Sequence, residues 1–163
     1  MSGRYSRQKG YRIEHELVKL LESYNINSKR VPLSGGSWLK GDIIIEHNNR
    51  TYICEVKGGS NKFKSVYDKY LTYRDTTNKS CVYIGNYILC DIPTFVKLLN
   101  NETDIINNVS DSLDITKLKM INDYINKKDV LFIKRDRKEY LVIFRKQLFE
   151  SLNGGVSNGE PNE

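Results

Sequence analysis

The 163-residue chain has few of the residues that staple small proteins or bind zinc. Its three cysteines, Cys54, Cys81 and Cys90, are an odd number without a Cys-x-x-Cys spacing. This usage is typical of buried thiols in a reducing compartment and disfavours a disulfide framework or a zinc site. The only two histidines, His15 and His47, have no metal-ligand partner at a useful spacing. A nuclease motif built on histidine is therefore not expected.

Long apolar stretches are missing as well. No run approaches the roughly 18 apolar residues of a membrane span. The basic segment 1–7 is not followed by the apolar region of a signal peptide. With the cysteine usage, this predicts a cytoplasmic, intracellular protein that has no membrane partner.

Basic residues outnumber acidic ones, at 26 Lys and Arg against 20 Asp and Glu, for a net charge of +6. This balance suits a polyanionic partner. A chain of this length can bury about two-thirds of its unfolded surface. We expect one domain over 1–152, with a core at about 4–100 and a helix plus β-hairpin over 114–152. The Gly-, Ser- and Asn-rich tail 153–163 is expected to be disordered.

Apolar spacing predicts alternating helices and strands. Apolar residues three and four apart predict a helix over 10–25, after an extended basic segment 1–9. Further helices are expected over 63–75, 92–99, 115–126 and 145–152, while 102–113 stays unassigned. Strands are expected at 26–33, 42–46, 51–57, 81–84, 87–90, 130–133 and 140–144, with a turn at 47–50 joining the second and third.

Two of these strands carry charged residues within apolar runs. Asp42 precedes Ile43-Ile44-Ile45, and Glu55 follows thirteen positions later, two residues before Lys57. Because side chains alternate along a strand, Glu55 and Lys57 share a face, and a hairpin would bring Asp42 beside them. Charged groups seldom enter a buried strand without a partner, since desolvating them costs several kcal/mol. Two carboxylates meeting there would repel each other and raise one pKa unless a cation joined them.

These groups are the ones that a phosphodiester-cleaving metal site needs. Mg²⁺ takes oxygen ligands and usually keeps several waters, so Asp42, Glu55 and the backbone carbonyl of Val56 can form a first shell. Lys57 can hold the attacking water and offset charge on the transition state. The alternative is a surface hairpin with an ordinary Glu/Lys pair, which contributes only about 0–1 kcal/mol. The apolar run after Asp42 and the Gly-rich approach before it favour the metal site.

The order of charged positions over roughly residues 4–60 resembles the PD-(D/E)XK nuclease superfamily. Within it, the chain is most similar to archaeal-type Holliday junction resolvases and the small nucleases of phages and mobile elements. Gly41 stands where the motif name has Pro. The matching positions are Gly10-x-x-x-Glu14-x-Glu16-Leu17, Arg30, Ser34, Asp42 and Glu55-Val56-Lys57.

The resemblance implies a restriction-endonuclease-like fold of the α/β or α+β class, with a central mixed β-sheet flanked by helices. It implies that Asp42 and Glu55 bind the metal and that Lys57 is the catalytic lysine. Glu14, otherwise a glutamate on the flank of a solvated helix, would reach the same site. A hydroxyl of the site would come from Ser34, with Ser37 as the alternative.

The expected activity is endonucleolytic hydrolysis of DNA with Mg²⁺ as cofactor and Mn²⁺ as a substitute. By the resemblance, the substrate is a four-way junction in DNA recombination or repair, and the products carry 5′-phosphate and 3′-hydroxyl ends. Two symmetric cuts imply a C₂ homodimer. Two alternatives stay open: a restriction- or repair-type endonuclease that cuts duplex or nicked DNA, and a non-catalytic DNA-binding protein on the same fold.

Basic residues lie on both sides of the motif and can contact phosphates, although ordinary surface charge is the alternative for each of them. The segment Arg135-Asp136-Arg137-Lys138 is expected to be only a charged hairpin tip. The predicted DNA-binding residues are Arg4, Arg7, Lys9, Arg12, Arg30, Lys40, Lys62, Lys64 and Arg74.

Overall fold

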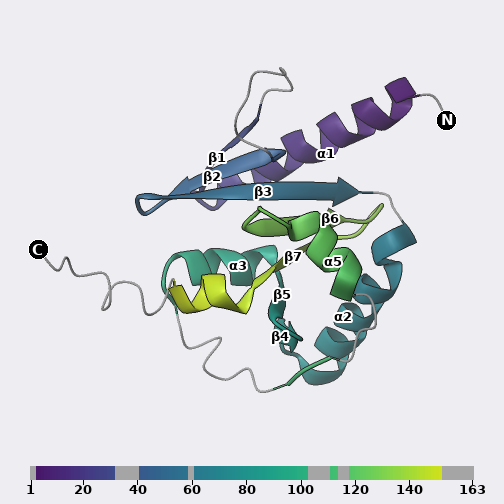
Figure 1. The fold of residues 1–163 in the computed structure, drawn as a ribbon, viewed down its shortest axis with the longest axis vertical. Helices are drawn as coiled ribbons and strands as arrows, with labels where there is room; N and C mark the ends of the chain where they lie inside the picture. Colours follow the sequence, from purple (N-terminus) through teal and green to yellow (C-terminus); the bar gives the residue numbers. More distant parts are fainter. Residues whose placement is uncertain (1–2, 32–40, 59–60, 103–110, 114–117, 152–163) are drawn as a thin grey trace, which may run out of the picture.

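The computed structural model describes residues 3–31, 41–58, 61–102, 111–113 and 118–151 (Figure 1). Over these residues the chain forms a seven-stranded mixed sheet with helices on both faces, as expected. The strands are β1 (Asn27–Arg30), β2 (Ile43–His47), β3 (Arg50–Gly58), β4 (Cys81–Ile84), β5 (Tyr87–Asp91), β6 (Val130–Lys134) and β7 (Tyr140–Arg145). The helices are α1 (Gly3–Ser23), α2 (Lys64–Thr77), α3 (Ile92–Leu99) and α5 (Leu118–Ile125), followed by a helical segment at 146–151.

The sheet has the strand order β1-β2-β3-β6-β7-β5-β4. Helices α1 and α3 cover one face, and α2 and α5 cover the other. Strand β6 is buried on both sides, because Val130 and Phe132 join the first core while Leu131 and Ile133 join the second. No helix within the described ranges is long and apolar enough to cross a membrane.

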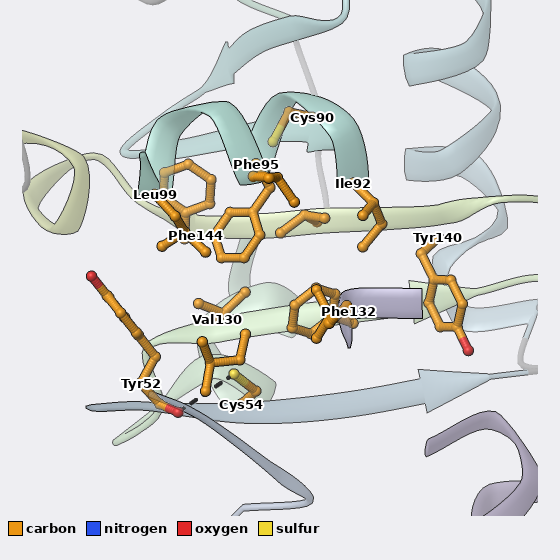
Figure 2. Packing of buried hydrophobic residues seen from close by; sticks show 14 of the residues in the cluster. Tyr52, Cys54, Cys90, Ile92, Phe95, Leu99, Val130, Phe132, Tyr140 and Phe144 are labelled. Carbon is orange, nitrogen blue, oxygen red and sulfur yellow. Dashed lines mark hydrogen bonds between the residues drawn. The ribbon is translucent and has the colours of Figure 1, made fainter. Parts of the chain in front are cut away.

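Aromatic rings fill the core beneath α3 (Figure 2). The Phe95 ring meets Phe132 edge-on and Phe144 at a tilt, with ring centroids 5.7 Å apart in both pairs. Cys54 and Cys90 belong to the same core and are fully buried. Together with buried Cys81, they are free thiols, as the sequence indicated.

The β2–β3 hairpin has the register that the sequence predicted. Its two-residue turn, Asn48-Asn49, has φ values of 49° and 64°, which is typical of a type I′ turn. Ile43 pairs with Cys54. Just before β2, the Asp42 amide bonds to the Cys54 carbonyl and the Asp42 carboxylate accepts from the Val56 amide, so Asp42 lies against the part of β3 that contains Glu55.

The C-terminal hairpin of β6 and β7 lies in the middle of the sheet. The sequence predicted the hairpin but not its position in the sheet. β6 pairs in parallel with β3, and β7 pairs with β5. The start of β6 is fixed to β3 by Asp129, whose carboxylate accepts from the Ile53 amide at 2.8 Å. The Asp129 amide donates to the Ile53 carbonyl at 2.7 Å. Residues far from the charged motif are thus brought beside it.

The expectation of an extended segment before residue 10 is wrong for residues 3–9, because α1 already begins at Gly3. A Cβ on Gly10 would meet nothing within 4 Å, and an exposed glycine costs a helix only about 1 kcal/mol relative to alanine. That cost does not end the helix. Residues 115–117 of the expected helix and the tail 153–163 lie outside the described residues.

Candidate active site

Asp42 is held against β3 by both its backbone and its side chain. Its amide donates to the Cys54 carbonyl at 2.8 Å, and its Oδ2 accepts from the Val56 amide at 2.8 Å. Burial raises the pKa of Asp42, and the negative charge of Glu55 raises it further. The Val56 hydrogen bond and the charge of Lys57 act in the opposite direction but do not cancel the rise in pKa. The structure thus holds two acids close enough to repel each other.

Gly41 packs directly behind this aspartate. A Cβ at Gly41 would lie 2.7 Å from Cγ2 of Ile53 and 3.0 Å from the carbonyl oxygen of Cys54. The position next to Asp42 therefore has no room for a side chain while the backbone keeps this path. This close approach explains why glycine occupies the position where the motif name has Pro.

Glu55 lies between two lysines. The Lys57 Nζ is 2.9 Å from Oε2 of Glu55, and the Lys128 Nζ is 3.3 Å from Oε1. Burial lowers the pKa of Lys57, but the hydrogen bond and the charge of Glu55 outweigh burial, so its pKa is raised. The Lys57 ammonium also lies 5.2 Å from the centroid of the Tyr124 ring on α5, within cation–π range. Lys57 is therefore charged and held in one place.

Glu14 faces the same group of charges from α1. Its Oε1 is 3.0 Å from Nε of Arg30, and both side chains are at least three-quarters buried. Burial raises the pKa of Glu14, and the charge of Asp42 raises it further, against the opposing effect of Arg30. The helix can approach β3 because Gly58 has no side chain: a Cβ there would lie 2.3 Å from Cδ1 of Ile13.

The site therefore combines three carboxylates and three cations, and their charges balance. They are Glu14, Asp42, Glu55, Arg30, Lys57 and Lys128.

The donor set fits a small divalent cation at Asp42 and Glu55. The carboxylates of Asp42 and Glu55 repel each other, and a hard cation that takes oxygen ligands would relieve that repulsion. Within the described part of the chain, no group of three or more His, Cys, Asp or Glu side chains converges to hold a metal. A shell of two acids, the Val56 carbonyl and water does not require such a group. Glu14 instead pairs with Arg30, so its contact with a metal remains a prediction.

A basic pocket of about 510 Å³ adjoins Glu14. The Arg30 guanidinium lies 4.0 Å from the centroid of the Tyr11 ring, which holds it flat against α1. Three of the predicted DNA-binding arginines thus gather beside Glu14. The pocket is lined by Arg4, Arg7, Gln8, Gly10, Tyr11, Glu14 and Arg30.

Other predicted residues have local partners or are not described. Arg12 is exposed on α1. Ser34, Ser37 and Lys40 lie outside the described residues, as does the side chain of Lys62. Three predicted cations are paired with acids of their own: Lys9 with Asp136 at 3.2 Å, Lys64 with Asp68 at 2.7 Å, and Arg74 with Glu139 at 3.1 Å.

Sequence reasoning missed Lys128 and Tyr124. Both come from α5 and the turn after it, about 70 residues beyond Glu55. The only sequence signal is a lysine just before an apolar strand, which is too common to single out. The two residues become visible once β6 is known to pair in parallel with β3.

Neither a protein-family model nor a curated protein matches this chain. The likeness to PD-(D/E)XK nucleases rests on the order of the charged residues and on their arrangement around β3. Membership of that superfamily stays a prediction.

Proposed function

We propose that this protein is a Mg²⁺-dependent endodeoxyribonuclease. The observation that carries the proposal is the placement of Asp42, just before β2, against the part of β3 that contains Glu55, with the Lys57 Nζ 2.9 Å from Glu55. Two neighbouring acids, one of them with a pKa raised by burial and by the charge of the other, next to a fixed lysine, are the groups needed for metal-assisted hydrolysis of a phosphodiester. The pocket of arginines beside Glu14 supports an anionic substrate.

In this proposal Asp42, Glu55 and the Val56 carbonyl hold the metal, and Glu14 completes the site. A bound Mg²⁺ supplies Lewis-acid stabilisation and lowers the pKa of the attacking water. Asp42 needs little reorganisation, because the Val56 amide already fixes its carboxylate. Lys57 donates a hydrogen bond toward the attacking water and offsets negative charge in the transition state.

The substrate proposed for this site is branched DNA, cut symmetrically by a homodimer of this chain in the cytoplasm. This choice rests on the resemblance to junction-resolving enzymes. A single site makes one cut, so two symmetric cuts require two copies related by a two-fold axis.

Cleavage of a four-way junction, compared with a linear duplex of the same sequence, tests the proposal. We expect Mg²⁺ or Mn²⁺ to support paired, symmetric cuts in the junction, with little cutting of the linear duplex, and EDTA to abolish both. Equal cutting of the two substrates would favour a duplex-acting nuclease. Binding without metal-dependent cutting would favour a non-catalytic DNA-binding protein.

A further inference from the structure

The tip of the β6–β7 hairpin lies at the same end of the sheet as the candidate active site. In the parallel register, Lys57 pairs with Ile133 and Gly58 pairs with Lys134. Residues 135–139 therefore follow directly beyond the end of β3 that carries the catalytic lysine. Figure 1 shows the end of β3, the first turns of α1 and the β6–β7 connection on the same side of the molecule.

This tip is fixed from two sides. Arg135 bonds to Asp68 on α2 at 3.0 Å, and Asp136 pairs with Lys9 on α1 at 3.2 Å. Lys134 donates to a backbone carbonyl of the tip at 3.0 Å, so its charge closes the turn. These contacts occupy three charged side chains of the hairpin and hold its backbone in one position.

Two cations of the tip are left for another partner. Arg137 and Lys138 are both exposed, and neither has an ion-pair partner among the described residues. Arg137 has a φ of 61°, a left-handed conformation that tightens the turn between the two strands. The tip therefore presents two adjacent unpaired positive charges on a fixed backbone.

In strand order, Asp42 and Glu55 lie between Arg30, which lines the pocket, and the tip. Across this end of the sheet come Arg30 at β1, Asp42 before β2, Lys57 near the end of β3, and then the tip. With strands about 4.8 Å apart, β6 lies about 14 Å from β1, and the middle of the β6–β7 tip lies about 17 Å from β1. One DNA strand covers that distance in about five nucleotides at 3.4 Å each.

We propose that Arg137 and Lys138 bind phosphates of the DNA backbone, on the opposite side of the cut from the pocket of Arg4, Arg7 and Arg30. The position of the cut rests on the proposed nuclease function. The contact of Arg137 and Lys138 with phosphates depends only on their positive charges and their exposed position at the tip. A continuous strand then crosses the acids with a basic contact on each side, which fixes the scissile phosphate over the site.

Salt-dependent DNA binding in EDTA tests this inference without cleavage. The double variant Arg137→Gln, Lys138→Gln is compared with Lys97→Gln, Lys119→Gln, which removes the same charge from exposed positions on α3 and α5. Anisotropy of labelled duplex and four-way junction DNA gives the affinity at each salt concentration. Each phosphate contact contributes about 0.9 to the log–log slope, so the tip variant should lose about 1.8 and the control should match the parent.

The possible outcomes separate the two proposals. If the parent binds DNA and the tip variant has the slope of the control, the tip contact is wrong while the nuclease proposal stands. If the parent binds neither DNA at low salt, both proposals are wrong. Thermal melts that match among the three proteins show that the change in slope comes from the lost contacts.

Discussion

The ammonium of Lys128 lies 3.3 Å from Oε1 of Glu55, and the exposed fractions of these side chains are 17% and 14%. Lys57 holds the other oxygen of the same carboxylate at 2.9 Å. A divalent cation that binds Glu55 must therefore approach an acid that already has two cations beside it. Since like charges repel more strongly where water is scarce, we expect Lys128 to oppose metal binding at Glu55.

Replacing Lys128 with methionine should strengthen metal binding. The variant keeps most of the apolar stem but removes the charge that competes for Oε1. We expect the Kd for Mn²⁺, measured by calorimetry, to fall roughly tenfold, which corresponds to about 1.4 kcal/mol.

Lys119→Met is the matched control, because that side chain is 92% exposed on α5. The control should bind Mn²⁺ as the parent does. If Lys128→Met binds Mn²⁺ with unchanged or lower affinity, Lys128 does not compete for Glu55. The variant Glu55→Gln should bind weakly whether or not Lys128 is present.

Neutralising the two acids should have opposite effects on the stability of the metal-free protein. Asp42→Asn removes a charge disfavoured by burial and by Glu55, and its amide oxygen can still accept from Val56. We expect its Tm to rise by about 2–4 °C. Glu55→Gln leaves Lys57 and Lys128 facing each other and should destabilise by about 1–3 kcal/mol. Melting in EDTA measures both changes, and a lower Tm for Asp42→Asn would contradict the electrostatic account.

The stabilisation by Asp42→Asn should depend on pH. Because the folded state raises the pKa of Asp42, it binds that proton more tightly than the unfolded state does. Below the ordinary pKa of an aspartate, both states are protonated, and parent and variant should melt alike. As pH rises through the raised pKa, the parent loses stability and the difference in Tm should open. A difference that stays constant from pH 4 to 7 would show that the effect is not ionisation of Asp42.

The close approach of α1 to β3 should depend on Gly58. A Cβ there would lie 2.3 Å from Cδ1 of Ile13, so Gly58→Ala should destabilise by about 1–3 kcal/mol. Adding Ile13→Val removes the clashing carbon and should recover part of that loss. Gly10→Ala, where a Cβ meets nothing within 4 Å, should instead stabilise by about 0.5–1 kcal/mol. Urea unfolding of Gly58→Ala, Ile13→Val, their double variant and Gly10→Ala measures these differences, and full additivity of Gly58→Ala and Ile13→Val would refute the contact.

The central hairpin could be predicted because its signals are local. Alternation placed Glu55 and Lys57 on one face, and the short Asn-containing turn fixed the β2–β3 register, which begins directly after Asp42. The helical stripe around Ile13 and Leu17 likewise identified the buried face of α1. These parts of the fold need only neighbouring residues to specify them.

The rest of the site depends on pairing between distant segments. Nothing near Lys128 indicates that β6 lies beside β3, because a strand buried on both faces has no alternation to reveal its neighbours. The same pairing brings the segment 135–138 to the end of the sheet that carries Lys57. The start of α1 was expected to be extended because residues 3–9 are mostly polar and basic and lack the apolar spacing that indicates a helix. The structure shows that the helix continues through them.

Cleavage of a four-way junction by site variants tests the central claim most directly. Asp42→Asn, Glu55→Gln and Lys57→Met should each lower the single-turnover rate with Mg²⁺ by about 10²-fold or more and still bind DNA in EDTA. Glu46→Gln is the control: it changes an acid on β2 that pairs with exposed Lys29 at 3.4 Å, and it should cut at the parental rate. Full Mg²⁺-dependent cleavage by Asp42→Asn and Glu55→Gln would contradict this account of the site.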